Sequence, residues 1–220
     1  MERYNFNLIY KLLYNHFGFL NWWPGETVDE IIIGAVLTQN TNWKNVEKSL
    51  KRLKENNLIS IEKIANMKKE DLARLIRPSG FFNQKAQRLI NLAKNIMSYG
   101  SIEQFFNKDI ESLRKELLEI NGIGKETADS IILYAANKPI FVIDAYTRRI
   151  INRVFDEHFE VNDYDKLQKL IQDSIPLDLN LYKDFHAQFV ELAKHYCKKE
   201  PLCNACPLKD LCKFSKGNSK

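Results

Sequence analysis

The stretch LLEINGIGKETADSIILYAA, residues 117–136, decides the fold, because it reads as a helix, a four-residue turn and a second helix. Gly122 and Gly124 permit backbone conformations that side chains forbid, so successive N–H groups can converge where the second helix starts. Such a site takes an anion, which in a nucleic acid is a phosphate. Lys125 adds a cation there, and we expect Ile123 to pack the hairpin together. An ordinary helical hairpin with a glycine cap is the alternative.

Apolar residues recur at helical spacing along most of the 220-residue chain, for example in LINLAKNI, residues 89–96. Prolines and glycines break the pattern, as at residues 24–25, 78–80 and 121–124, which leaves roughly ten helices. Only FVID, residues 141–144, reads as extended, and it is too short to found a sheet. The sequence therefore predicts an all-α protein.

The formal net charge of +5 mildly favours a polyanionic partner. The N-terminal residues 1–19 lack an apolar signal-peptide core and a small-residue cleavage site. No apolar run approaches the ~18 residues of a membrane span. These features predict a cytoplasmic protein without a membrane partner.

All four cysteines lie in HYCKKEPLCNACPLKDLC, residues 195–212, with five, two and five residues between successive cysteines. In a reducing compartment such a cluster indicates a metal site rather than disulfides. Both zinc and an iron–sulfur cluster suit four thiolates. The candidate ligands are Cys197, Cys203, Cys206 and Cys212.

The segment KPIFVIDAYTRRI, residues 138–150, places Asp144 between an apolar stretch and the next helix. A helix N-cap is one explanation for this aspartate. GIGKETA followed by VID also resembles the helix-hairpin-helix and Gly-Pro-Asp signature of the endonuclease III superfamily of DNA glycosylases, although the Gly-Pro pair is absent. The resemblance implies that Asp144 is the catalytic carboxylate.

Four segments narrow the resemblance: WWP (22–24), GAVLTQNTNW (34–43), RPSGFFNQKAQRLI (77–90) and GIGKETAD (122–129). Together they closely resemble the endonuclease III-like 3-methyladenine DNA glycosylases over nearly the full chain. The resemblance implies an aromatic pocket for a flipped base, with a carboxylate beside it, and a set of residues that contact DNA. The pocket residues are Trp22, Trp23, Pro24, Trp43 and Glu126, and the DNA-binding residues are Gln39, Gly122, Ile123, Gly124, Lys125 and Thr127.

Gln39 aligns with a glutamine that fills the gap left by the extruded nucleotide. Core packing remains the alternative for the tryptophans. Bifunctional relatives carry a lysine at the position of Glu126, and a carboxylate cannot form the Schiff base through which they cut the abasic product. The adjacent Lys125 is rotated by about 100° around a helix. We therefore predict a monofunctional glycosylase.

Endonuclease III-like enzymes bind a [4Fe–4S] cluster at the position of the four cysteines, with a first spacing one residue longer than here. The best-known form of the 3-methyladenine branch lacks these cysteines, so the chain departs from that branch toward the parent family. We expect a structural [4Fe–4S] cluster in preference to zinc. It would hold the basic residues Lys198, Lys199, Lys209 and Lys213 against the DNA backbone.

The chemistry of the base agrees with this resemblance. Purines alkylated at N3 or N7 are cationic, so an aromatic face attracts them beyond simple stacking. The positive charge makes the base a good leaving group, which leaves Asp144 to stabilise the oxocarbenium-like sugar and to orient or deprotonate water. Flipping is easiest for a damaged, poorly paired base.

We expect two helical lobes, with Asp144 at their junction. One spans residues 28–138 as a six-helix barrel-type lobe with the hairpin at 112–136, and the other joins 1–27 to 139–220 with the cysteines at 197–212. The expected partner is double-stranded DNA with a damaged base, bound by a monomer. The alternatives are a bifunctional endonuclease III acting on oxidised pyrimidines and a non-catalytic DNA-binding module. An adenine-mismatch glycosylase would need a further C-terminal domain.

Overall fold

The structure is a computed structural model, and it describes residues 4–20 and 25–217. Within these ranges the chain forms α-helices, short 3-10 helices and a π-helix, without a β-strand. The predicted all-α class is therefore confirmed. None of the described helices is long and apolar enough to cross a membrane.

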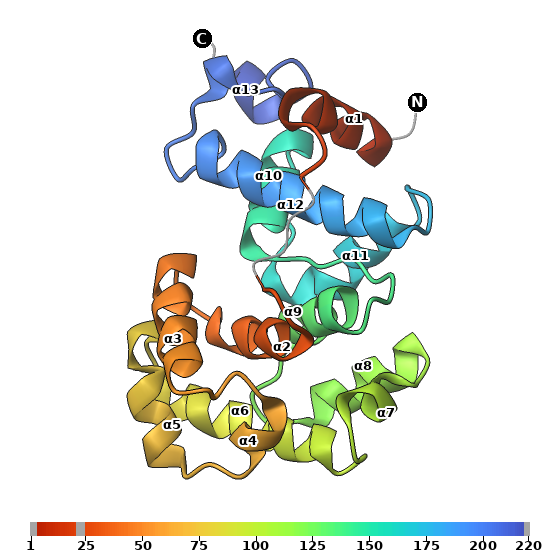
Figure 1. The fold of residues 1–220 in the computed structure, drawn as a ribbon. Coiled ribbons are helices and arrows are strands. Elements are labelled where there is room, and N and C mark those ends of the chain that lie inside the picture. The colour runs from red at the N-terminus through yellow and green to blue at the C-terminus, as the bar shows by residue number, and fades with distance from the viewer. Residues whose placement is uncertain (1–3, 21–24, 218–220) are drawn as a thin grey trace. The chain divides into compact units, whose positions relative to one another are not determined.

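The helices follow one another closely along the chain (Figure 1). The α-helices are α1 (Phe6–Phe17), α2 (Val28–Leu37), α3 (Trp43–Glu55), α4 (Ile61–Ala65), α5 (Lys69–Leu75), α6 (Phe82–Met97), α7 (Ile102–Phe106), α8 (Ile110–Glu119), α9 (Lys125–Ser130), α10 (Ala145–Phe155), α11 (Tyr164–Gln172), α12 (Leu179–His195) and α13 (Lys213–Gly217). The 3-10 helices are η1 (Arg77–Ser79), η3 (Val161–Asp163) and η4 (Cys203–Ala205), and the π-helix is η2 (Ile131–Ala135).

Short polar side chains start many of these helices. Thr27, Asn42 and Asp109 each accept a hydrogen bond from the backbone N–H three residues later, at the starts of α2, α3 and α8. Such a cap satisfies one of the N–H groups that the first turn leaves without a partner. The residues immediately before these helices thus determine where each helix begins.

The residue contacts divide the chain into two compact units. Unit 1 comprises Met1–Trp23 and Pro139–Lys220, and unit 2 comprises Pro24–Lys138. The lobes predicted from the sequence, with boundaries at 27/28 and 138/139, stay a prediction of the domain organisation.

In unit 2 helix α2 packs against α6, α9 and η2. It is apolar almost all round, and Ile32, Ile33, Val36 and Leu37 are fully buried. A helix with this composition belongs in a core rather than at a surface. Burial therefore fixes the end of α2, and with it the start of the segment that follows, beginning with Thr38.

In unit 1 helix α12 packs against α1 and α10, and α10 also packs against α13. The core includes the fully buried rings of Phe141, Phe185 and Phe189. Phe185 and Phe189 stack with ring centroids 4.6 Å apart, and Phe141 meets both edge-on. Aromatic pairs in these geometries add to the stabilisation from burial.

Residues 137–144 connect the units without regular secondary structure. The apolar residues 141–143 are buried, so their backbone polar groups need partners inside the protein. Side chains of α11 supply several of these partners. Phe141 N–H donates to Gln172 at 2.8 Å, Gln168 donates to Phe141 C=O at 2.6 Å, and Ile143 N–H donates to the Tyr164 hydroxyl at 3.2 Å. The stretch predicted as extended thus pairs with side chains instead of a strand.

Candidate functional site

Asp144 ends this buried connection and is the N-cap residue of α10, with φ −88° and ψ 177°. Its Oδ1 accepts a hydrogen bond from the Thr147 backbone N–H at 2.6 Å. Its Oδ2 lies 3.7 Å from Nε2 of His186 in α12, and the Asp144 side chain is 15% exposed. Capping engages one carboxylate oxygen, so the N-cap explanation and the catalytic explanation are compatible.

The surroundings of Asp144 favour its ionised form. Burial by itself raises the pKa of the Asp144 carboxyl, but contacts with His186 and with the Thr147 backbone N–H outweigh burial, so the pKa lies below its ordinary value. Asp144 is therefore a carboxylate at neutral pH. That is the state needed to stabilise a developing cation or to accept a proton from water.

The hairpin turn lies between α8 and α9 in unit 2. Gly122 has φ +89°, in the left-handed region, whereas Gly124 has φ −92° and ψ 175°, an extended conformation open to any residue. The expectation that both glycines are required by backbone conformation holds for Gly122 and is wrong for Gly124. Ile123 is buried, as expected for the residue that packs the hairpin together.

Helix α9 is shorter than the predicted second helix. It ends at Ser130, and the chain continues through the π-helix η2, whose five residues are all buried. In unit 2 Asp129 is fully buried and accepts two hydrogen bonds from Arg114 of α8, at 2.7 and 3.2 Å. A paired guanidinium and carboxylate of this geometry fixes the two helices of the hairpin against each other.

Gln39 follows the end of α2 and is tied to the hairpin by its side-chain amide. Its Nε2 donates to Gly122 C=O and to Thr127 Oγ1, both at 3.0 Å. Its Oε1 accepts from Nη1 of Arg88 in α6 at 2.6 Å. We call these four residues, Gln39, Arg88, Gly122 and Thr127, the Gln39 clamp. The clamp joins three segments that are far apart in the sequence.

Arg88 also lies directly beneath the turn. A Cβ atom added to Gly122 would stand 2.4 Å from Cγ and Nε of Arg88. Real Cβ atoms do not approach other atoms so closely, so only a glycine leaves room for the arginine. Gly122 is therefore required twice, by its backbone conformation and by the close approach of Arg88.

Lys85, one turn before Arg88, is buried and organises the neighbouring loop. Its Nζ donates to Leu37 C=O at 2.8 Å and to Ser79 C=O at 2.7 Å. Burial, assisted by the charge of Arg88, lowers the pKa of Lys85 to about 8. These bonds bring the loop after η1 to the end of α2, and that loop carries Phe81, which is 62% exposed at φ +45°.

The predicted base pocket is only partly described. Trp22, Trp23 and Pro24 lie outside the described residues. Trp43 is the first residue of α3 and half-buried, and its ring atom Cη2 lies 3.6 Å from the position that a Cβ on Gly34 would take. Glu126, the second residue of α9, is exposed. Trp43 thus packs partly on α2, and its role toward a base stays a prediction.

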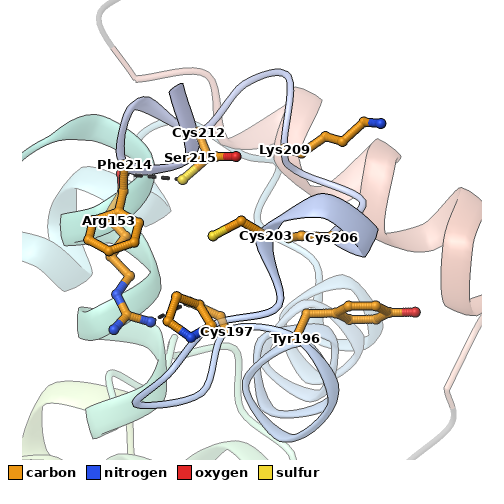
Figure 2. Close-up of a pocket in the computed structure, with 10 residues that line it drawn as sticks. Arg153, Tyr196, Cys197, Cys203, Cys206, Lys209, Cys212, Phe214 and Ser215 are labelled. Carbon is orange, nitrogen blue, oxygen red and sulfur yellow. Dashed lines mark hydrogen bonds between the residues drawn. The ribbon is translucent and has the colours of Figure 1, made fainter. Parts of the chain in front are cut away.

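The four cysteines line one cavity in unit 1 (Figure 2). The cavity encloses about 280 Å³ of empty space, counting its open mouth, and Arg153, Tyr196 and Phe214 also line it. Among the described residues no three Cys, His, Asp or Glu side chains are placed to hold a single metal ion. Four free thiols that line one cavity are a donor set that both a [4Fe–4S] cluster and zinc use, so the residues present fit such a group, and its identity stays a prediction.

Burial governs the acidity of two of these thiols. It raises the pKa of Cys206 to about 11 and also raises the pKa of Cys212. Because the thiolate is the metal ligand, these protons have to leave when a metal group binds. Metal binding at this cavity would thus be coupled to deprotonation.

Two arginines of α10 hold the cysteine loop. Arg149 donates twice to Cys197 C=O, at 3.0 and 2.8 Å. Arg153 donates to Cys197 Sγ at 3.3 Å and to the carbonyl groups of Lys198 and Lys199. Lys213, one of the lysines predicted to face DNA, donates to Phe155 C=O at the end of α10. The loop is therefore fastened to the same helix that Asp144 caps.

Sequence reasoning missed several residues that the structure places at these sites. The missed residues are Lys85, Arg88, His186 and the exposed Phe81. The local sequence offers no signal for them, because Lys85 and Arg88 lie in the polar stretch NQKAQR, residues 83–88, and His186 lies in KDFHAQ, residues 183–188, a stretch of mixed composition. Their partners lie in distant parts of the sequence. His186 faces Asp144, 42 residues earlier in the chain, whereas Lys85 bonds to Leu37 and Arg88 to Gln39.

Comparison with known families decides the identity. The family model described as HhH-GPD superfamily base excision DNA repair protein matches residues 33–177, more than half of the chain. The chain belongs to this superfamily. By family it is therefore a base excision repair DNA glycosylase.

Relatives agree with this assignment. A Methanocaldococcus jannaschii protein, MJ1434, whose name proposes a DNA repair glycosylase, is 47% identical over 209 residues, which are 93% of this chain and 94% of that protein. Endonuclease III of Thermotoga maritima is 30% identical over 191 residues, 86% of this chain and 84% of the relative.

Solved structures confirm the endonuclease III-type fold. Helicobacter pylori 3-methyladenine DNA glycosylase (MagIII), bound to 1,N6-ethenoadenine, matches with a TM-score of 0.76 and 37% identity, over 85% of this chain and 96% of that chain. A trapped endonuclease III–DNA covalent intermediate matches with a TM-score of 0.82 over the full length of both chains. At 21% identity the second likeness shows the fold alone.

The Gln39 clamp predicts unequal effects for the two hairpin glycines. Gly122→Ala should lower the free energy of unfolding by about 1–3 kcal/mol, because the new Cβ meets Arg88 on a left-handed backbone. Gly124→Ala is the matched control, with open space around its Cβ, and should change stability by less than ~0.5 kcal/mol. Denaturant unfolding measures both values. Equal losses in the two variants would contradict the clamp.

Proposed function

We propose that this protein is a monofunctional DNA glycosylase that removes alkylated purines of the 3-methyladenine type from double-stranded DNA. The observation that carries the substrate class is the 37% identity to the Helicobacter pylori 3-methyladenine DNA glycosylase over 85% of the chain. The exposed carboxylate of Glu126, where bifunctional relatives carry a lysine, supports the absence of strand cleavage.

Asp144 supplies the catalytic carboxylate in this proposal. When the bond between the sugar C1′ and the base nitrogen breaks, the electron pair leaves with the cationic base and neutralises it. The sugar gains positive charge, which an ionised Asp144 stabilises. A water molecule then adds its oxygen to C1′, and its proton passes to the Asp144 carboxylate or to solvent. The low pKa of Asp144 supports this role, since the group must be ionised before the reaction.

The substrate's charge explains why no strong general acid is required. A base alkylated at N3 or N7 departs as a neutral molecule, so protonation of the leaving group adds little. An aromatic face also attracts a cationic base more strongly than neutral adenine. Trp43 is the described candidate for this contact, together with the predicted Trp22 and Trp23.

The hairpin and its neighbours form the proposed DNA-binding surface of unit 2. Gly122 to Lys125 would contact a backbone phosphate, which positions the protein without reading sequence. Thr127 and Gln39 support the turn through the Gln39 clamp. The exposed ring of Phe81 stands on a loop tied to the end of α2, where an apolar side chain can enter the base stack.

The four cysteines are proposed to hold a [4Fe–4S] cluster. When bound, the cluster would supply a structural cross-link between α12's end and the C-terminal loop. Arg149 and Arg153 fix the backbone around Cys197, which orders one ligand before the cluster assembles. The exposed Lys198, Lys199 and Lys209 would then face the DNA backbone.

A base-release assay tests the catalytic and substrate proposals together. Duplexes carrying 3-methyladenine, 7-methylguanine, hypoxanthine, uracil or thymine glycol are incubated with the protein, and free base is measured. We expect release of the methylated purines and at least ~100-fold slower release by Asp144→Asn. Asp178→Asn is the control, because Asp178 caps α12 by the same backbone contact. Exclusive release of thymine glycol would overturn the substrate class, and full activity of Asp144→Asn would overturn the catalytic role.

Borohydride trapping on abasic DNA tests the absence of strand cleavage. We expect no covalent protein–DNA adduct, because Glu126 has no amine to form a Schiff base. Thermotoga maritima endonuclease III serves as the positive control. An adduct that disappears in Lys125→Gln would show that the neighbouring lysine acts as the nucleophile and that the protein is bifunctional.

Metal analysis tests the cofactor. Protein purified without oxygen should contain iron and acid-labile sulfide in equal amounts, and Cys203→Ser should lose most of both. Ser215→Ala is the matched control, since Ser215 lines the same cavity without a thiol. Zinc without sulfide in the unaltered protein would contradict the cluster.

A further inference from the structure

The two oxygens of Asp144 are held by different parts of unit 1. Oδ1 receives the Thr147 backbone N–H of its own helix, and Oδ2 faces Nε2 of His186 at 3.7 Å. The first contact comes from the sequence next to Asp144. The second comes from α12, which packs against α10. The side chain that faces Oδ2, His186, thus lies 42 residues after Asp144 in the sequence.

His186 is a buried polar residue in an apolar setting. It is 5% exposed in the middle of α12, and its chain neighbours Phe185 and Ala187 are fully buried. Burying an imidazole is costly unless it finds polar partners. The buried carboxylate on α12, Asp184, accepts from the Tyr10 hydroxyl at 2.9 Å and from Leu20 N–H at 2.8 Å. Asp184 is therefore committed to the N-terminal segment, while His186 faces Asp144.

We propose that His186 is a positioning residue for base excision, which acts through Asp144 by fixing the direction of Oδ2. This inference rests on the proposed catalytic role of Asp144. The distance of 3.7 Å exceeds that of a hydrogen bond. Catalytic contacts in free enzymes are often long and shorten in the complex with substrate.

The electrostatics agree with this geometry. Burial raises the pKa of the Asp144 carboxyl, and His186 is the first of the contacts that bring it below its ordinary value. Without His186, the hydrogen bond that the structure gives Asp144 would be the one from the Thr147 N–H to Oδ1. The carboxylate would then be capped but free to turn about its Oδ1 hydrogen bond.

Single-turnover kinetics on a duplex with the released base identified above separate positioning from stability. His186→Leu should lower the excision rate by ~10- to 100-fold, as expected for a misplaced catalytic group, with unchanged affinity for a duplex carrying a tetrahydrofuran abasic analogue. His186→Gln keeps a polar N–H donor near Oδ2 and should recover most of the rate. Leu192→Ala, a buried apolar change on the same helix, is the stability control and should lower only the melting temperature.

Two outcomes would overturn the inference. One is a wild-type excision rate in His186→Leu. The other is a parallel loss of rate, affinity and melting temperature without rescue by His186→Gln. Asp144→Asn, measured beside the His186 variants, separates a failure of the role of His186 from a failure of the proposed function. If Asp144→Asn is inactive and His186→Leu is fully active, only the role of His186 fails; if Asp144→Asn excises normally, the proposed function fails as well.

Discussion

The hydrogen bonds that satisfy the buried connection before α10 are the constraint on which the position of Asp144 depends. Residues 141–143 are buried without a strand partner, so Gln168, Gln172 and Tyr164 supply the donors and acceptors that a sheet would have supplied. The main chain is thereby fixed up to Asp144. Helix α10 then begins at a defined point, which also fixes the position of its N-cap residue Asp144.

The helical fold and its main landmarks could be predicted because they rest on local signals. Apolar periodicity, the breaks at proline and glycine, and capping side chains such as Asp144 act within a few residues of chain. The hairpin and the cysteine cluster were likewise readable from spacing. The family match over residues 33–177 agrees with the resemblance that these motifs carried.

The remaining features depend on contacts between distant segments, which no local pattern specifies. Gly124 has the same residue type as Gly122, but only the backbone path of the turn decides which of the two has a positive φ. Arg88 and His186 read as ordinary polar residues of helices until packing brings them to Gln39 and Asp144. Residues 141–144 read as extended, but the side chains of α11 that pair with their backbone could not be found from local sequence.

The hydrogen bonds of the Gln39 clamp would oppose the role toward DNA that is predicted for Gln39. If Gln39 is to fill the gap left by an extruded nucleotide, it first gives up its three hydrogen bonds to Arg88, Gly122 and Thr127. At ~1 kcal/mol each, that is an energetic threshold of ~3 kcal/mol, or roughly a hundredfold in population. A well-paired base resists extrusion and does not offset the threshold, whereas a weakly paired, damaged base does. A contact inside the resting protein would thus act as a filter that turns away normal base pairs before the active site meets them.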